Sequence, residues 1–414
     1  MLDKVIRMVR FKRLSYRTAF LTIIISFFTC CYILFQFINS NDSIKRFDDY
    51  YLTPADVVDN KIEIRIKPDL KRKNDIVKDA TFFTICRNSD LDGIKNSIES
   101  LEKNFNKNFN YPWIFANDEP FTNEFKDKIS QIVSGDVTFT VIPKEYWDVP
   151  KFIDQTFLKD QLEQFEMENV MYGGNLSYRK MCRFNSGFFY KLKALSKYNW
   201  YWRVEPNVKY TCELPEDPFK IMVDENKLYA FVLAMTEDKR TVRKLWATSR
   251  NYFENLNSWN NTIEDGEIYQ SISNTSLGFI EQNTDRNELV RGEFNYCHYW
   301  SNFEIGNLNF FRGSEYDGYF QEIDKTGNFF YERWGDAPVH TIAISYLLAP
   351  DKIKYFDNSG YFHENIGNCP RDKNDYKDLH CKCSKHREFS WHRHSCVPRW
   401  FKGLKMDLPQ EIHW

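Results

Sequence analysis

A predicted buried strand that ends in a carboxylate lies near the middle of the chain. Residues 198–204 read Tyr-Asn-Trp-Tyr-Trp-Arg-Val, and Glu205, Pro206 and Asn207 follow them. Aromatic and β-branched residues in such a run are typical of a strand inside a sheet. Pro206 lacks a backbone N–H and biases the residue before it towards an extended conformation, which suits the end of a strand. Because open α/β sheets bind ligands at the carboxyl ends of their strands, this run predicts a ligand site beside Glu205.

Two interpretations of Glu205 are open from these residues alone. Hard divalent cations prefer carboxylate and phosphate oxygens, so Glu205 can hold such a cation against a phosphate group. A single acidic tripeptide is a weak signal, however, and an exposed glutamate at the end of a strand needs no ligand. Motifs elsewhere in the chain have to distinguish the two.

The segment that follows residue 79 alternates between strand and helix patterns. Ala80–Cys86 is a continuous apolar run suited to a buried parallel strand. After a polar turn, Ile94, Ile98 and Leu101 are spaced by four and three residues, as on one face of a helix. Further strands are predicted over 113–116 and 137–142, and helices over 123–132 and 151–168. This alternation predicts an α/β fold that opens like a nucleotide-binding half-fold but lacks the glycine-rich phosphate loop.

The N-terminal part of the chain predicts a membrane anchor. Residues 1–17 form a basic cytoplasmic tail, and residues 18–38 carry no charge over a length that can cross a bilayer as a helix. A cleaved signal peptide is the alternative, but 36–40 is a poor cleavage site. A polar luminal stem is expected over 39–78 and a luminal catalytic domain over 79–414. The pattern is that of a single-pass type II membrane protein.

Cysteine content and net charge narrow the compartment and the partners. Eight cysteines follow the predicted anchor, and an even number in an oxidising lumen suggests disulfides of unknown pairing. Cys381, Cys383 and Cys396 with nearby histidines can also be drawn as a zinc cluster, but their spacing fits no usual zinc pattern. The net charge is −2, from 56 basic and 58 acidic side chains, so the basic surface expected of a nucleic-acid partner has no support.

Six ordered motifs together resemble one enzyme family. They are Phe83–Leu91, Tyr111–Thr122, Tyr178–Phe189, Tyr201–Pro206, Trp300–Leu308 and Gly335–His340. In order and approximate spacing they are similar to the fungal glycolipid 2-alpha-mannosyltransferase family of Golgi alpha-1,2-mannosyltransferases. The resemblance covers roughly residues 79 to 400. It departs at one position, because the family's Glu-Pro-Asp reads Glu-Pro-Asn here, with Asn207 in third place.

The resemblance implies a fold, a reaction and a location. The expected fold is a GT-A-like nucleotide-sugar transferase domain, with a mixed, mainly parallel central sheet flanked by helices. The expected reaction moves mannose from GDP-mannose to a mannose-terminated glycan with retention, forming alpha-1,2 linkages in protein N- or O-glycosylation and cell-wall mannan. Mn²⁺ is the implied cofactor. The Golgi membrane is the implied location.

The resemblance also assigns roles to particular side chains. Glu205 and His363 are expected to ligate Mn²⁺, and Tyr178 to lie on the acceptor side. Arg87, Arg183 and Arg203 are candidates for pairing with the GDP phosphates, since guanidinium matches phosphate oxygens in bidentate geometry. Asp336 is expected to orient acceptor hydroxyls or the sugar. Each residue also has a plain alternative: a surface histidine, a half-buried tyrosine, a structural ion pair or a turn.

Glu304 is the predicted catalytic carboxylate. If residues 300–311 were helical, Trp300, Glu304, Leu308 and Phe311 would share one face, and a glutamate on that apolar stripe would need a partner such as Arg312. In the resembling family this glutamate is the proposed nucleophile beneath the anomeric carbon. It can attack that carbon in a double displacement, or stabilise positive charge on the sugar during front-face transfer.

Two other functions remain open from the sequence. Some members of the resembling family transfer mannosylphosphate, in which case the product retains phosphate. The change to Asn207 also raises a different class of function, a catalytically silent glycan-binding or scaffold subunit. Neither the natural acceptor nor the oligomeric state follows from the sequence.

Overall fold

The computed structural model describes residues 62–67, 76–260, 280–282, 292–404 and 406–407. The predicted cytoplasmic tail, the transmembrane helix and most of the predicted stem lie outside these residues. Among the helices in the described ranges, none combines the length and the apolar character needed to cross a membrane. All the described residues belong to one compact unit of the chain, which falls within Asn60–Trp414.

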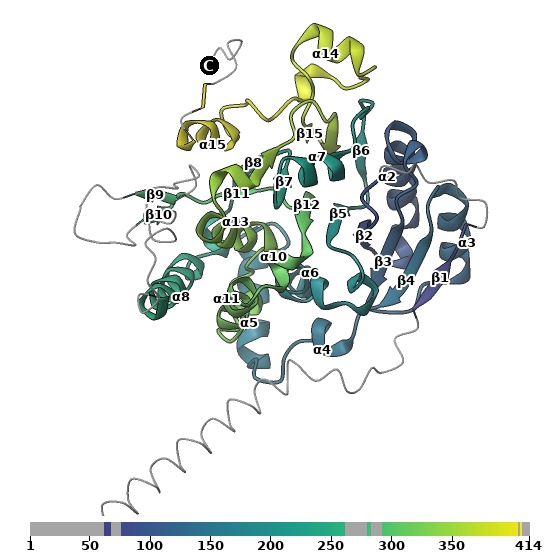
Figure 1. The fold of residues 1–414 in the computed structure, drawn as a ribbon. Coiled ribbons are helices and arrows are strands. Elements are labelled where there is room, and N and C mark those ends of the chain that lie inside the picture. Colours follow the sequence, from purple (N-terminus) through teal and green to yellow (C-terminus); the bar gives the residue numbers. More distant parts are fainter. Residues whose placement is uncertain (1–61, 68–75, 261–279, 283–291, 405, 408–414) are drawn as a thin grey trace, which may run out of the picture. The chain divides into compact units, whose positions relative to one another are not determined.

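A central eight-stranded sheet organises the body (Figure 1). Four strands form a parallel block, and β12 is inserted antiparallel between β5 and β7. In spatial order the strands are β1 (Glu63–Arg65), β4 (Val137–Val141), β3 (Trp113–Asn117), β2 (Ala80–Ile85), β5 (Trp200–Val204), β12 (Phe303–Asn307), β7 (Tyr229–Phe231) and β13 (Ile353–Tyr355). The predicted mixed α/β architecture with a central sheet is confirmed.

Helices cover the sheet, and small sheets extend it. The helices are α2 (Leu91–Asn104), α3 (Asn123–Ile132), α4 (Lys144–Trp147), α5 (Gln155–Met167), α6 (Leu176–Gly187), α7 (Pro218–Asp224), α8 (Leu245–Asn260), α10 (Leu308–Arg312), α11 (Ser314–Asp324), α12 (Asn328–Tyr331), α13 (Asp336–Leu347), α14 (Lys373–Asp378) and α15 (Val397–Gly403). The minor strands are β6 (Val208–Tyr210), β14 (Tyr361–His363) and β15 (Ile366–Gly367) in one sheet, β8 (Ala234–Thr236) with β11 (Cys297–Tyr299), and β9 (Ile280–Gln282) with β10 (Gly292–Phe294). The helix predicted through Ile94, Ile98 and Leu101 is present as α2, and the helix predicted over 123–132 is present as α3.

Strand β5 is buried on both faces, and its alternation separates the core from the site. Trp202 packs into the aromatic core, with its ring 5.4 Å from that of Phe82. Phe82 in turn stacks on Trp113 at 4.4 Å. Because successive side chains of a strand point to opposite faces, Tyr201 and Arg203 project to the other side. The apolar side therefore fixes where the charged side of the strand lies.

The helix considered over residues 300–311 is wrong. Phe303–Asn307 forms strand β12, and only Leu308–Arg312 is helical. Phe303 and Ile305 alternate into the aromatic core, and β12 pairs on both sides, with β5 and with β7. Cross-strand pairing and burial therefore outweigh the apolar spacing that suggested a helix. Gly306 permits the close packing, since a Cβ there would come within 2.7 Å of the Tyr201 ring.

The folded body begins before residue 79. Glu63–Arg65 adds to the edge of the central sheet as β1, antiparallel to β4. Arg65 makes ion pairs with Glu63 at 2.8 Å and with Asp127 of α3 at 2.7 Å. A segment assigned to the stem therefore belongs to the folded body, where it forms the short edge strand of the central sheet.

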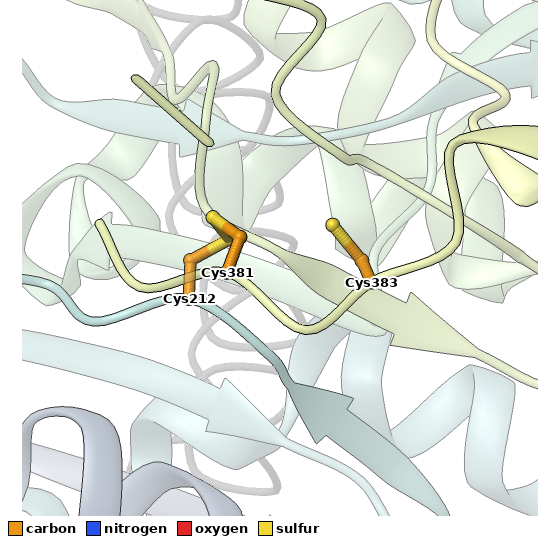
Figure 2. A group of neighbouring side chains, drawn as sticks. All are labelled: Cys212, Cys381 and Cys383. Atoms are coloured by element: carbon orange, nitrogen blue, oxygen red, sulfur yellow. A yellow bond between two sulfur atoms is a disulfide. The ribbon is translucent and has the colours of Figure 1, made fainter. Parts of the chain in front are cut away.

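Two disulfides, Cys212–Cys381 and Cys297–Cys396, tie the C-terminal segment to the body, and a third, Cys369–Cys383, closes a loop within that segment. Figure 2 shows Cys212 joined to Cys381, with Cys383 nearby. These three sulfurs are the one metal-like cluster of three or more ligand groups among the described residues. They are bonded as disulfides and supply no thiolate, so the preference for disulfides over zinc is confirmed.

Candidate functional site

Arg203 lies at the centre of a buried charge network at the end of β5. Its Nη1 is 2.5 Å from Asp336 Oδ2, and its Nη2 donates to Glu205 Oε1. Nη1 also lies 3.8 Å from Glu304 Oε1. Burial alone lowers the pKa of Arg203, but these three carboxylates outweigh it and hold the pKa well above its ordinary value. The network therefore brings together four of the residues that the sequence predicts.

The sheet register explains how residues distant in sequence meet in this network. Antiparallel pairing of β12 with β5 sets Glu304 directly opposite Arg203, so both side chains project from the same face. Asp336 is the first residue of α13, and it also accepts a hydrogen bond from Ser301 Oγ at 2.7 Å. Burial raises the pKa of Asp336, but Arg203 and His340 outweigh that effect and lower it. Asp336 is therefore held as a carboxylate.

Glu304 is enclosed by donors that the sequence analysis did not identify. Oε1 accepts from the Tyr201 hydroxyl at 2.9 Å, and Oε2 accepts from the Tyr229 hydroxyl at 3.0 Å. His340 Nδ1 lies 3.0 Å from Oε2. The glutamate is 1% exposed. The partner suggested from sequence, Arg312, instead donates to three backbone carbonyls and is not the neutralising group.

His363 approaches the network from the small sheet. β14 pairs with β6 so that His363 lies opposite Val208, three residues after Glu205. The imidazole stacks on Trp300 with ring centroids 5.3 Å apart. Its Nδ1 is 2.5 Å from Asn302 Nδ2. The two predicted metal ligands therefore lie on adjoining segments: Arg203 holds Glu205, and Asn302 contacts the His363 ring.

Tyr178 lies in α6 and feels the charge of Asp336. Its ring stacks on that of Tyr172 at 4.5 Å, and the Arg333 guanidinium lies 5.3 Å from its centroid. Burial raises the pKa of Tyr178 well above its usual value, and the charge of Asp336 adds to the rise. Arg333 is held at a φ of 76°, which an arginine rarely adopts, and it pairs with Glu237 at 3.2 Å. Backbone strain of this kind often concentrates at functional sites.

The three predicted phosphate-binding arginines separate in the structure. Arg203 belongs to the network. Arg87 is exposed just after β2, where it hydrogen-bonds Ser177. Arg183 does not join them, because its guanidinium makes two hydrogen bonds to Asp324, at 2.7 and 2.8 Å, in a buried ion pair. Arg183 therefore does not belong to this site. It forms a structural ion pair, which was the alternative interpretation from the sequence.

Some of the missed residues had a signal in the sequence. Tyr201 precedes Arg203 by two positions, so strand periodicity places it on the same face. His340 follows Asp336 by four positions, so helix periodicity places both on one face. For Asn302 and Arg333 no local pattern indicates a role.

Solved structures with the same fold identify the class of protein. Core-mannan synthase A from Aspergillus fumigatus, in an Mn/GDP form, matches with a TM-score of 0.70 and 35% identity, covering 82% of this chain and 88% of that one. The mannosyltransferase Ktr4p from Saccharomyces cerevisiae, in complex with GDP, matches with a TM-score of 0.68 and 33% identity, covering 81% and 83%. The fold is that of a glycosyltransferase.

Sequence comparison identifies the family. The family model for glycolipid 2-alpha-mannosyltransferase matches residues 39–405. Glycolipid 2-alpha-mannosyltransferase 1 of Candida albicans is 42% identical over 334 residues, covering 81% of this chain and 73% of that protein. The O-glycoside alpha-1,2-mannosyltransferase homolog 3 of Schizosaccharomyces pombe is 43% identical over 325 residues, covering 78% and 82%. The chain belongs to the glycolipid 2-alpha-mannosyltransferase family, as its motifs predict.

Proposed function

We propose that this chain transfers mannose from GDP-mannose to a mannose-terminated glycan and forms an alpha-1,2 linkage with retention. The observation that carries the proposal is the network of Arg203 with Glu205, Glu304 and Asp336 at the carboxyl end of β5. The names of relatives and the GDP in two similar structures support the donor and the linkage. The donor carries an α-linked mannose, so an α-linked product means retention. The domain would be of the GT-A type.

The side chains near Glu205 fit a manganese ion. Glu205 offers a carboxylate and His363 an imidazole, and donor phosphate oxygens can complete the shell. Asn302 Oδ1 is buried without a hydrogen-bond partner among the described residues. If the amide of Asn302 turns over, Oδ1 accepts from Nδ1–H of His363 and leaves the Nε2 lone pair free for a cation. The orphaned oxygen is the observation that supports His363 as a ligand.

Individual residues of this chain have separate roles in the proposed transfer. Bound manganese would neutralise charge on the departing diphosphate. Arg87 is exposed and can pair with a phosphate oxygen, while Arg203 keeps Glu205 in place. Both oxygens of Glu304 accept hydrogen bonds from tyrosine hydroxyls, which fix the carboxylate in place, and its proposed role is to stabilise positive charge on the sugar. Asp336 and Tyr178 would face the acceptor.

We also propose the Golgi lumen as the location of the domain, in a single-pass type II protein. The basic and uncharged segments over 1–17 and 18–38 support the topology. Three disulfides support an oxidising compartment.

Linkage analysis of the product tests the function. Purified full-length chain with GDP-mannose, Mn²⁺ and mannobiose-type acceptors should give one added mannose in an alpha-1,2 linkage, with no phosphate in the product. Chelation of the metal is the control and should stop transfer. A β-linked product would refute retention, and a product that keeps phosphate would establish mannosylphosphate transfer in its place.

The structure weighs against the silent-subunit alternative that Asn207 raised. Asn207 adopts a φ of 65°, and its N–H donates to the Gly93 carbonyl at 3.1 Å. Its side chain packs against Gly93 of α2, where an added Cβ would lie 2.8 Å from Oδ1. Asparagine and aspartate both tolerate this left-handed conformation. The residue therefore serves the turn between β5 and β6, and the chain retains both proposed metal ligands.

Asn207→Asp is accordingly expected to change the transfer rate by no more than about 3-fold. The new carboxylate would face the first turn of α2, where a negative charge is favourable by roughly 0.3–1 kcal/mol. Initial rates and urea unfolding of both proteins measure this. Asn207→Val is the contrast, because a β-branched residue in this conformation should destabilise the turn by about 1–3 kcal/mol. A large gain of activity in Asn207→Asp would show that the asparagine impairs this chain.

A further inference from the structure

His340 lies between two hydrogen-bond acceptors in the centre of the protein. Its Nδ1 is 3.0 Å from Glu304 Oε2, and its Nε2 is 3.0 Å from the backbone carbonyl of Asn185 in α6. The imidazole is fully buried, with the Phe311 ring 5.2 Å away and the Tyr316 ring 6.0 Å away. Solvent therefore cannot supply a third partner to either nitrogen.

Each of the two contacts of the His340 ring requires a proton between the nitrogen and its acceptor. A backbone carbonyl can only accept, so Nε2 carries hydrogen. A neutral imidazole would then present the Nδ1 lone pair to a carboxylate oxygen, which places two lone pairs against each other. The Nδ1–Oε2 contact therefore holds a proton as well. Either His340 is an imidazolium beside an ionised Glu304, or the imidazole is neutral and Glu304 is a carboxylic acid.

The surroundings of the pair favour the ionised form. Tyr201 and Tyr229 both donate to Glu304, and hydrogen bonds to a carboxylate stabilise its charged state. Asn185 lies in the last turn of α6, where the helix dipole favours a cation. The charged and titratable groups that face the pair are Tyr201 and Arg203 on β5, Tyr229 on β7, Tyr316 on α11 and Asp336 on α13.

We propose that His340 is a positioning residue held as an imidazolium, which keeps Glu304 ionised and fixed in direction beneath the donor sugar. The part that concerns Glu304 in transfer rests on the proposed function. The protonation state does not, because it follows from the contacts of the folded chain alone. Arg203 then faces Oε1 of Glu304 and His340 faces Oε2, while the hydroxyls of Tyr201 and Tyr229 donate to the same carboxylate.

Nitrogen NMR tests the protonation state without any turnover. Full-length chain labelled with ¹⁵N-histidine should show one buried ring with both nitrogens protonated at about pH 7, where an exposed histidine is mostly neutral. In Glu304→Gln the new amide can donate to Nδ1, so this ring should lose one proton and its signal is thereby assigned. If neither Glu304→Gln nor His340→Gln folds, the wild-type spectrum alone still tests whether a doubly protonated ring is present. A spectrum with no doubly protonated ring would overturn the proposal.

Kinetics then test the positioning role. His340→Phe should lower kcat by about 10²–10³-fold, as expected when a donor to a preorganised charge is lost, with little change in KM for GDP-mannose. His340→Gln retains one donor to Glu304 and should fall between. His298→Gln is the matched control, because His298 is also buried and near a backbone carbonyl but lies outside the network.

The two proposals fail in different ways. Unchanged kcat in a folded His340→Phe would overturn the positioning role. Absence of transfer by wild-type chain would overturn the proposed function but leave the NMR result standing.

Discussion

Arg203→Ala is expected to abolish transfer and to lower the free energy of unfolding by about 3–5 kcal/mol, the usual cost of removing one partner of a buried ion pair. The substitution leaves Asp336 and Glu304 buried without their shared cation. It also removes the guanidinium that holds Glu205. Urea unfolding followed by circular dichroism measures the loss, and initial rates with GDP-mannose measure the activity.

The pH dependence of this variant should have the opposite sign to that of the wild type. In the wild type the pKa of Asp336 is lowered on folding, so its contribution to stability is present above about pH 4 and is lost as the pH falls. Without Arg203, burial dominates and raises the pKa of Asp336 above the unfolded value. The variant should then be closest to wild-type stability at low pH and lose stability as the pH rises.

Arg183→Ala is the matched control for Arg203→Ala. It breaks an equally buried pair, with Asp324, and should cost a similar free energy of unfolding. Because Arg183 lies outside the charge network, the protein that remains folded should still transfer mannose. Equal loss of activity in both folded variants would mean that the network contributes only stability.

His363→Ala is expected to weaken Mn²⁺ binding in the presence of GDP by about 10–100-fold or more, and transfer with it, since one of two proposed protein ligands is lost. Glu205→Gln should act in the same direction while it retains an oxygen for Arg203. Loss of the free-Mn²⁺ electron paramagnetic resonance signal on titration measures the affinity. His380→Ala is the control, since that exposed histidine pairs with Glu213 at 2.9 Å and belongs to a different surface.

Asn302→Ala distinguishes the role of the proposed ligand, His363, from that of the residue that contacts its ring. Removal of the amide that contacts Nδ1 should weaken Mn²⁺ binding less than removal of the imidazole itself. Wild-type affinity in both His363→Ala and Glu205→Gln would place the metal elsewhere.

Local pattern was sufficient for the parallel block of the sheet and insufficient for other strands, among them β1 and β12. A continuous apolar run gives β2, aromatic and β-branched residues give β3 and β4, and the spacing of Ile94, Ile98 and Leu101 gives α2. The segment around Glu304 misleads because residues 300, 304, 308 and 311 have helical spacing. Its true environment is set by β5 and β7, which pair with it from far along the chain.

For the functional site, too, local sequence predicts one part and distant contacts determine the other. Motifs predict Arg203, Glu205, Glu304 and Asp336, but not which of them touch. Arg183 finds its carboxylate 141 residues away, and Glu304 finds the Tyr201 hydroxyl 103 residues away. No local rule relates positions at such separations. Partner identity is therefore a property of the sheet register and helix packing, which only the folded chain supplies.

The pairing of β8 with β11 has a practical consequence for engineering. Thr236 lies opposite Cys297, so the two ends of the sixty positions that separate these strands are held next to each other. When residues are inserted between such fixed ends, the entropic cost of closing the loop rises only with the logarithm of its length. An epitope or reporter module spliced into the polar sequence 261–279 should therefore leave the charge network undisturbed.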